Sequence, residues 1–246
     1  MESPPDQKTT PPSVGVPFAP ADLFQSIFGG RHDTVDITRM AQLIAGWESA
    51  RYFLRRMQGC RVFRAVRPLY AHALGLRSVE GLTLEFGVAG GRTIRQIARA
   101  TPGTVYGFDA FQGLPERWRP GFETGAFAQA APPRVPENVE LVIGWFSETL
   151  PGFIARHPGP VSFLHIDCDL YSSTAEILRH VGPRLTRGSV VVFNEYFNFP
   201  GWQQHERKAW KECVAQLGIE YEYTAVNVVD QQVSLIVGKN PGYRES

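Results

Sequence analysis

The chain has 246 residues, of which 43% are hydrophobic and 20% are charged, with 25 Lys and Arg against 24 Asp and Glu. A chain of this length buries roughly 70–75% of the surface that its unfolded form exposes, which is enough for one or two domains that fold unaided. The formal net charge of +1, with the two signs interspersed, offers no basic footprint for phosphate backbones. Nucleic acid is therefore not expected as a partner.

The three cysteines, Cys60, Cys168 and Cys213, are odd in number and far apart, and they fit no Cys-x-x-Cys spacing. The sequence thus indicates neither a disulfide framework nor a thiolate zinc site. The first residues lack the apolar core of a signal peptide, and no apolar run approaches the ~20 residues that cross a membrane. We expect a cytoplasmic location without membrane contact.

The composition divides the chain into three parts. Residues 1–30 are rich in proline and are predicted to form a flexible lead. Residues 31–80 are predicted to be a helical accessory segment, with one helix between 36 and 57 and a second over 61–74. This segment would act as a cap or as a contact in a homo-oligomer. Residues 81–246 form the third part.

Short apolar runs alternate with amphipathic helices in this third part, over 82–86, 105–108, 139–143, 161–166 and 189–193. Such runs are typical of parallel strands that helices cover on both faces. A helix is predicted over 202–217, followed by strands over 221–229 and 232–237. Only Asp230 and Gln231 separate these strands, so they must pair antiparallel. We predict an α/β fold with a mostly parallel sheet, an antiparallel C-terminal hairpin at one edge, and helices on both faces.

Residues 112–138 are too rich in proline and glycine to be helical, yet they carry Trp118, Phe122 and Phe127. Loops of this length inside α/β domains are usually functional covers or disordered. The aromatic residues favour a cover over a site.

A glycine-rich turn, Gly87-Val88-Ala89-Gly90-Gly91, follows the first of these strands. Its spacing matches neither the dinucleotide fingerprint nor a phosphate-cradling loop, which indicates a ligand without a pyrophosphate. Asp109 ends the next strand, eighteen residues beyond Gly91, close to the ~20 at which an acid binds ribose hydroxyls in nucleoside-binding folds. Together the two features favour a nucleoside site, although a plain tight turn with a solvated Glu85, and Asp109 as a turn-former, would also fit.

Polar residues follow two further strands: Asp167 and Asp169 after one, Asn194 and Glu195 after the next. Neighbouring strands lie ~4.8 Å apart, so these side chains can converge on one ion or one hydroxyl. Oxygen ligands of this type suit Mg²⁺, Mn²⁺ or Ca²⁺. The alternative is that the acids cap the following helix while Asn194 and Glu195 are solvated. His205, at the start of the late helix, is a further candidate base, or an ordinary surface histidine.

Four motifs in order resemble the macrocin O-methyltransferase family, a branch of the class I S-adenosylmethionine-dependent methyltransferases of natural-product pathways. They are Glu-Phe-Gly-Val-Ala-Gly-Gly-Arg-Thr-Ile, Gly-Phe-Asp-Ala-Phe-Gln-Gly-Leu-Pro-Glu, Gly-Trp-Phe-Ser-Glu-Thr-Leu-Pro and His-Ile-Asp-Cys-Asp-Leu-Tyr-Ser-Ser-Thr. The resemblance runs over residues 82–238 and implies a Rossmann-like class I methyltransferase domain over 81–246.

The resemblance also implies roles for individual residues. The family binds S-adenosylmethionine, which implies cofactor contacts for the first motif, Asp109, Ser147 and Asp167. In the first motif, Glu85, Gly87 and Gly91 would line the methionine part of the cofactor, with Ala89 and Thr93 in the same turn. Asp109 would hold the ribose, and Ser147 would lie near the adenine.

The acids Asp167 and Asp169 match those from which the family draws a metal ligand and a general base. A metal site of Asp167, Asn194 and Glu195 holding Mg²⁺ is implied, but the family's second acidic pair usually begins with Asp, and here it begins with Asn194. Asparagine can ligate a cation but supplies no charge.

The leading hypothesis is an O-methyltransferase that acts on a hydroxyl of a small molecule, a sugar or a natural-product intermediate. Methyl transfer is an in-line displacement, so the protein mainly aligns the reactants, excludes water and provides a base such as Asp167, Asp169 or His205. One alternative is a protein of the same fold that binds S-adenosylmethionine but has a non-oxygen acceptor or no methyl transfer. Another is a nicotinamide-dependent oxidoreductase, against which the missing Gly-x-Gly-x-x-Gly counts.

Overall fold

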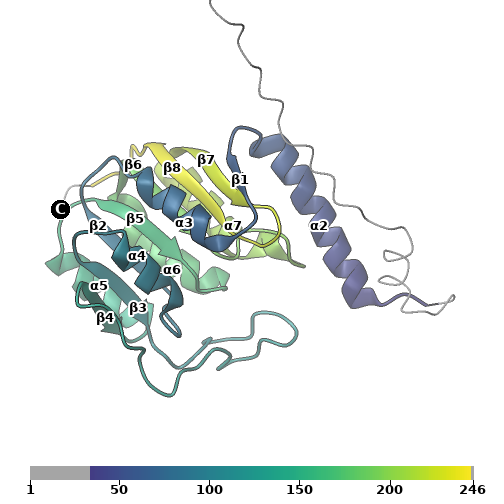
Figure 1. Cartoon of the computed structure of the whole chain (residues 1–246), viewed down its shortest axis with the longest axis horizontal. Coiled ribbons are helices and arrows are strands. Elements are labelled where there is room, and N and C mark those ends of the chain that lie inside the picture. The colour runs from purple at the N-terminus through teal and green to yellow at the C-terminus, as the bar shows by residue number, and fades with distance from the viewer. Residues whose placement is uncertain (1–33, 245–246) are drawn as a thin grey trace, which may run out of the picture. The chain divides into compact units, whose positions relative to one another are not determined.

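The computed structural model describes residues 34–244, so the predicted flexible lead over 1–30 lies outside the described residues. Eight strands form one sheet in the order β1-β7-β8-β6-β5-β2-β3-β4 (Figure 1). Their bounds are β1 Arg61–Phe63, β2 Leu82–Phe86, β3 Val105–Asp109, β4 Val139–Ile143, β5 Val161–Ile166, β6 Leu185–Phe193, β7 Glu220–Asn227 and β8 Val233–Lys239.

The sheet is parallel except at β8, which runs antiparallel to both β6 and β7. The remaining neighbours among the described strands pair in parallel. The predicted fold class is confirmed, including the antiparallel hairpin of β7 and β8. The structure adds β1 beyond the hairpin, where Val62 lies opposite Val226.

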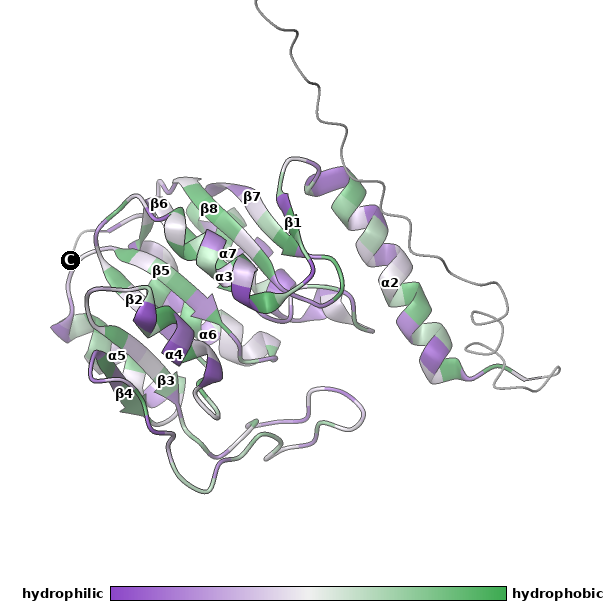
Figure 2. Cartoon of the chain, viewed as in Figure 1, coloured by the Kyte–Doolittle hydropathy of each residue, from purple (hydrophilic) through white to green (hydrophobic). Residues whose placement is uncertain are grey.

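Helices cover both faces of the sheet. They are α3 Val66–Gly75, α4 Arg92–Arg99, α5 Phe146–Arg156, α6 Tyr171–Val181 and α7 Glu206–Leu217, with short 3-10 turns over Gly182–Arg184 and Trp202–Gln204. A further helix, α2, spans Ile37–Arg56. One apolar core joins α3 and α4 to the sheet, and the other joins α5, α6 and α7 to its opposite face. In Figure 2 the strands are largely hydrophobic while α4 presents hydrophilic residues on its outer side.

Side chains alternate between these two cores along the strands. In β2, Leu84 and Phe86 are fully buried in the core of α5 to α7, which directs Glu85 to the opposite face. Burial of each such large apolar side chain contributes roughly 1.5–3 kcal/mol. The alternation therefore fixes which face each polar residue of a strand occupies.

The prediction of one helix over 61–74 is wrong at its start, because residues 61–63 form β1 and the helix begins at Val66. Val62 and Phe63 suit a strand, and pairing with β7 supplies their backbone hydrogen bonds. Both β1 and α3 contact β7. The boundary of the accessory segment near residue 80 stays a prediction.

Residues 110–138 connect β3 to β4 and contain only an isolated bridge between Arg119 and Phe122 (Figure 1). We call residues 112–138 the cover loop. Trp118 anchors this loop in the core of α5 to α7, with its ring 5.4 Å from the ring of Phe199. In the described part of the chain, no helix has the length and apolar character needed to cross a membrane.

Candidate active site

The turn after β2 can be built only with glycine at position 87. Gly87 has φ +90°, and a Cβ there would lie 1.7 Å from the carbonyl oxygen of Asp167. Its N–H donates to the carbonyl of Phe108, so the turn passes between the ends of β3 and β5. On the other side, the N–H of Asp167 donates to the carbonyl of Phe86. These two hydrogen bonds hold the turn at the carboxyl edge of the sheet, where open α/β folds bind ligands.

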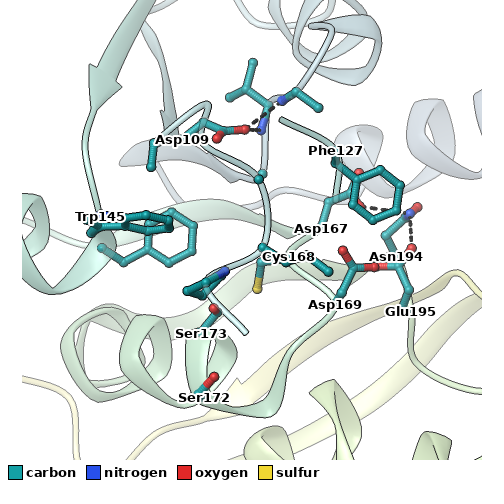
Figure 3. Close-up of a pocket in the computed structure, with 18 of the residues that line it drawn as sticks. Asp109, Phe127, Trp145, Asp167, Cys168, Asp169, Ser172, Ser173, Asn194 and Glu195 are labelled. Carbon is teal, nitrogen blue, oxygen red and sulfur yellow. Dashed lines mark hydrogen bonds between the residues drawn. The ribbon is translucent and has the colours of Figure 1, made fainter. Parts of the chain in front are cut away.

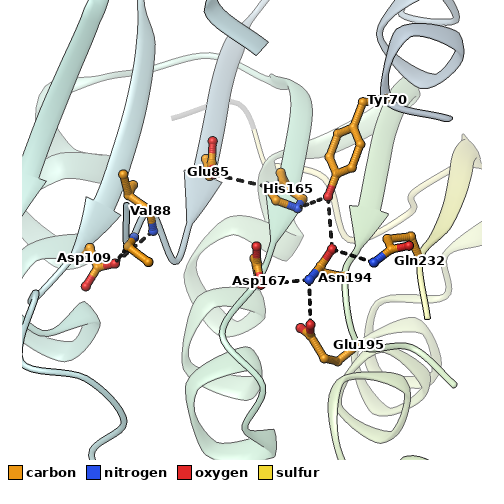
Figure 4. Close-up of polar contacts among 10 residues, drawn as sticks. Tyr70, Glu85, Val88, Asp109, His165, Asp167, Asn194, Glu195 and Gln232 are labelled. Atoms are coloured by element: carbon orange, nitrogen blue, oxygen red, sulfur yellow. Dashed lines mark hydrogen bonds and ion pairs between the residues drawn. The ribbon is translucent and has the colours of Figure 1, made fainter. Parts of the chain in front are cut away.

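Asp109 ties this turn to the end of β3. Its Oδ2 accepts hydrogen bonds from the N–H groups of Val88 at 2.9 Å and Ala89 at 2.7 Å, and its Oδ1 accepts from the N–H of Phe111 at 2.6 Å (Figure 4). A carboxylate has about four acceptor sites, so roughly one remains for a ligand hydroxyl. Asp109 is thus both a turn-former and a wall of the cavity described next.

A cavity of about 720 Å³ opens at this edge of the sheet (Figure 3). That volume lies within the range of small-molecule sites. The structure brings most of the predicted site residues together in its lining: Gly87, Ala89, Thr93, Asp109, Ser147, Asp167, Asp169, Asn194 and Glu195.

Two residues predicted to contact the cofactor do not line this cavity. Glu85 is fully buried on the α3 face, where its Oε1 lies 3.6 Å from Nδ1 of His165. Burial, and then the charge of Asp109, hold the pKa of Glu85 well above its usual range. Gly91 is the N-cap residue directly before α4, with φ +74°, and a Cβ there would lie 3.0 Å from Pro133.

His205 does not line the cavity either. Its ring packs against the rings of Trp118 and Phe199, at centroid distances of 6.3 and 5.7 Å. Burial and the guanidinium of Arg119 lower its pKa, which keeps the imidazole neutral. This histidine therefore anchors the cover loop, and its catalytic role has no support from its position.

Asp167 and Asp169 are the acids best placed for chemistry. Burial raises the pKa of each carboxyl to about 7. Asp167 accepts a hydrogen bond from Nδ2 of Asn194 at 3.0 Å. Asp169, held at φ +62°, accepts no hydrogen bond from any residue between 34 and 244, although the nearby Arg119 opposes the rise in its pKa. Its carboxylate is free to bind a ligand hydroxyl.

Two further carboxyls lie behind these acids. Glu195 and Glu206 are buried, and Oε2 of Glu206 accepts from the N–H of Glu195 at 3.0 Å. Burial holds the pKa of both well above the usual range of a glutamate. Protonation relieves the repulsion that ionised groups would create here.

The predicted metal site of Asp167, Asn194 and Glu195 offers a poor donor set. Asn194 turns its NH₂ group, not its oxygen, toward the other two side chains, at 3.0 Å from Asp167 and 2.6 Å from Glu195. Within residues 34–244 no group of three or more His, Cys, Asp or Glu side chains is arranged to hold a metal ion. The residues present do not fit a divalent cation.

Several lining residues were missed by reasoning from the sequence. Aromatic side chains of Phe127, Trp145 and Phe146 line the cavity, as do the hydroxyls of Ser172 and Ser173. Trp145 and Phe146 directly precede Ser147 in one of the quoted motifs, so their position beside a predicted adenine site could have been inferred. The two serines belong to the fourth quoted motif, but the motif did not indicate that the first turn of α6 faces the cavity.

The residues that form this site are similar in sequence to those of known methyltransferases. Residues 84–196 match a family model described as a methyltransferase domain. The 8-demethyl-8-(2,3-dimethoxy-alpha-L-rhamnosyl)-tetracenomycin-C 4'-O-methyltransferase of Streptomyces olivaceus is 37% identical over 60 residues, 24% of this chain and 22% of that protein. The demethyldecarbamoylnovobiocin O-methyltransferase of Streptomyces niveus is 28% identical over 170 residues, 58% of this chain and 63% of that protein. Both matches span less than two thirds of the curated relative.

Among solved structures, the calicheamicin methyltransferase CalS11 is 25% identical, with a TM-score of 0.53 over 69% of this chain and 76% of that one. The O-methyltransferase NovP is 24% identical, with a TM-score of 0.54 over 70% and 78%. The fold is therefore the Rossmann-like fold of the class I methyltransferases. Residues 84–196 are therefore similar to a methyltransferase domain, on a fold that the solved methyltransferases share.

Proposed function

We propose that this protein transfers a methyl group from S-adenosylmethionine to a hydroxyl of a small molecule, a sugar or a natural-product intermediate. The observation that carries the proposal is one cavity that joins a nucleoside-type wall, Asp109 with its glycine turn, to a pair of acids, Asp167 and Asp169. The relatives named above act on natural products, one of them on a rhamnosyl group. The four motifs that resemble the macrocin O-methyltransferase family support the same assignment.

The cofactor would lie along the wall formed by the glycine turn. Gly87 and Thr93 would flank its methionine part, and the remaining acceptor site of Asp109 would bind a ribose hydroxyl. Trp145 and Ser147 would lie beside the adenine, the first offering an aromatic surface and the second a hydroxyl. Glu85 would not contact the cofactor directly, since its carboxyl lies outside the cavity lining.

S-adenosylmethionine, when bound, supplies a methyl group on a positively charged sulfur. The acceptor hydroxyl must lose its proton as its oxygen forms the new bond to the methyl carbon, while the electron pair of the breaking bond returns to sulfur. Asp169 would take that proton, because it lines the cavity with no competing donor; Asp167 is the second candidate. The walls exclude water and hold acceptor and cofactor in line.

The cover loop would form the acceptor side of the cavity. Leu114 and Phe127 give this side an apolar surface, while Glu116, bonded to Ser172, gives it a polar one. Such a mixed lining suits a glycosylated or polyhydroxylated molecule with an apolar portion. The side chains of Ile44, Trp47 and Leu54 are exposed on α2, which supports the prediction that the segment over 31–80 acts as a cap or as a contact in a homo-oligomer.

Calorimetry with S-adenosylmethionine and S-adenosylhomocysteine tests the proposal directly. Each should bind at one site per chain, and NADH should not compete. A panel of hydroxylated acceptors, followed by mass spectrometry, should then reveal a product heavier by one methyl group. If neither cofactor form bound, the proposal would fail; binding with no turnover on any acceptor would favour a non-catalytic binding protein.

Replacing Asp109 with Asn is expected to weaken S-adenosylmethionine about 10- to 100-fold, since an amide accepts hydrogen bonds at only one of its two polar atoms. Calorimetry measures the change in affinity. The control is Glu80→Gln, which removes the same charge at an exposed position outside the cavity. Equal affinities for the two variants would remove Asp109 from the cofactor site.

The raised pKa values predict opposite effects of pH on rate and on stability. The turnover number should rise with pH through about 7, as Asp169 becomes able to accept a proton. The free energy of unfolding should fall as pH rises from 3.8, the ordinary value, to about 7, because the folded state retains protons that the unfolded state has lost. Rate profiles and urea unfolding at a series of pH values measure the two trends, and parallel trends would contradict the assignment.

A further inference from the structure

The side-chain amide of Asn194 lies between two carboxyls with its two ends in different surroundings (Figure 4). Its Nδ2 donates to Oδ1 of Asp167 at 3.0 Å and to Oε1 of Glu195 at 2.6 Å. Its Oδ1 accepts from the hydroxyl of Tyr70 at 3.3 Å and from Nε2 of Gln232 at 3.0 Å. All four hydrogen-bonding positions of the amide are thus used, and the NH₂ group faces the acids.

The orientation of this amide follows from a chain of hydrogen bonds that begins at the backbone. The N–H of Val229 donates to Oδ1 of Asn227 at 3.3 Å, and Nδ2 of Asn227 donates to Oε1 of Gln232 at 2.9 Å. Gln232 then presents its own NH₂ to Asn194. A backbone N–H can only donate, so the direction of every later bond in this chain is set by the first one.

A second chain reaches Asn194 from the opposite side. The hydroxyl of Tyr70 lies 3.3 Å from Oδ1 of Asn194, to which it donates, and 2.5 Å from Nε2 of His165. Both Tyr70 and His165 are fully buried, so water offers them no other partner. A flipped Asn194 would set its NH₂ against the NH₂ of Gln232, leaving buried donors unpaired at about 1–3 kcal/mol each. The NH₂ group of Gln232, whose direction is set from the backbone, therefore holds the NH₂ group of Asn194 toward the acids.

This arrangement does for the acids what a cation would do. The two N–H groups of Asn194 bridge Asp167 and Glu195 and hold the two carboxyl groups at fixed positions. The amide hydrogens fill the space in which a cation would need an oxygen ligand. The guanidinium of Arg119 in the cover loop interacts electrostatically with the carboxyl groups of Asp169 and Glu195.

We propose that Asn194 replaces a divalent cation in this site: its NH₂ group fixes the positions of Asp167 and Glu195, and methyl transfer proceeds without a metal ion. Asn194 is a positioning residue here, since it acts through the two carboxyls. The statement that methyl transfer needs no metal ion rests on the proposed function. The statement that this site binds no divalent cation rests only on the positions of its residues.

The first test titrates Mg²⁺ and Mn²⁺ into the unmodified protein and follows the melting temperature and the electron paramagnetic resonance signal of free Mn²⁺. We expect no shift in melting temperature and no loss of signal. Turnover of the same protein should be unchanged after exhaustive chelation. Saturable Mn²⁺ binding that Asp167→Ala abolishes, or activity that chelation removes and Mg²⁺ restores, would overturn the inference.

The second test uses Asn194→Asp, which sets a carboxylate where the NH₂ group lies. This variant should bind Mn²⁺ and gain melting temperature with added metal, and its turnover should fall about tenfold or more on chelation. The matched control is Gln58→Glu, which adds one negative charge at an exposed position and should behave like the unmodified protein. If Asn194→Asp folds and still ignores Mn²⁺, the amide is not what excludes the cation, and the inference fails.

The two proposals fail in different ways. Absence of S-adenosylmethionine binding would end the proposed function and leave the Mn²⁺ titration of the unmodified protein as a valid test of the amide. Methyl transfer that requires Mg²⁺ would support the proposed function and end this inference alone.

Discussion

Replacing Asp169 with Asn is expected to lower the turnover number by roughly 10² to 10⁴, the usual contribution of a positioned general base. The affinity for S-adenosylmethionine should stay within the range of the unmodified protein, because the amide has nearly the same size and Asp169 makes no hydrogen bond to the cofactor wall. The rise of rate through pH 7 should also disappear, since the group that titrates there is gone. Steady-state kinetics at several pH values and calorimetry measure these effects separately.

Asp167→Asn is the informative comparison for this variant. Asp167 already accepts from Asn194, so an amide at position 167 would face another amide and disturb the positions of the acids. We expect it to lose activity but to keep the pH dependence that Asp169 confers. If instead Asp167→Asn flattened the pH profile and Asp169→Asn kept it, the base would be Asp167.

Replacing Gly87 with Ala is expected to destabilise the fold by about 2 to 5 kcal/mol, the sum of a strained positive φ and an overpacked contact. The added Cβ would meet the carbonyl oxygen of Asp167 at 1.7 Å, and neither backbone segment can move without breaking its hydrogen bonds to the adjacent strand. In a domain of this size the melting temperature should fall by roughly 5 to 15 °C. Binding of S-adenosylmethionine should weaken in parallel, because the same turn forms its wall.

Gly90→Ala provides the control within the same turn. A Cβ at Gly90 meets nothing within 4 Å, and its φ is not positive. Its melting temperature should match that of the unmodified protein. If Gly87→Ala and Gly90→Ala had the same melting temperature, the close approach of the turn to β5 would not constrain position 87.

The strands and the hairpin were predictable from local patterns. Short, mainly apolar runs such as 82–86 and 161–166 are typical of strands buried on both faces of a parallel sheet. The two-residue connection at Asp230 leaves only an antiparallel pair. The strand β1 was not predictable, because three residues carry too little periodicity and their pairing with β7 joins segments more than 150 residues apart.

The meeting of the glycine turn with Asp109 followed from spacing, since a turn and an acid at the next strand end lie at one edge of the sheet. The roles of Glu85 and His205 did not follow. Alternation along β2 directs Glu85 to the face opposite the cavity, and the packing of His205 against Trp118 depends on where the cover loop folds back.

The fold class, and the acids gathered at one edge of the sheet, could be predicted from the sequence alone. The sequence also identified Asn194 as the departure from an all-acid set. Only the tertiary structure decided which way that amide points, because its partners Tyr70 and Gln232 come from distant segments of the chain. Hydrogen-bond direction depends on donors and acceptors in three dimensions, and no spacing along the chain records it.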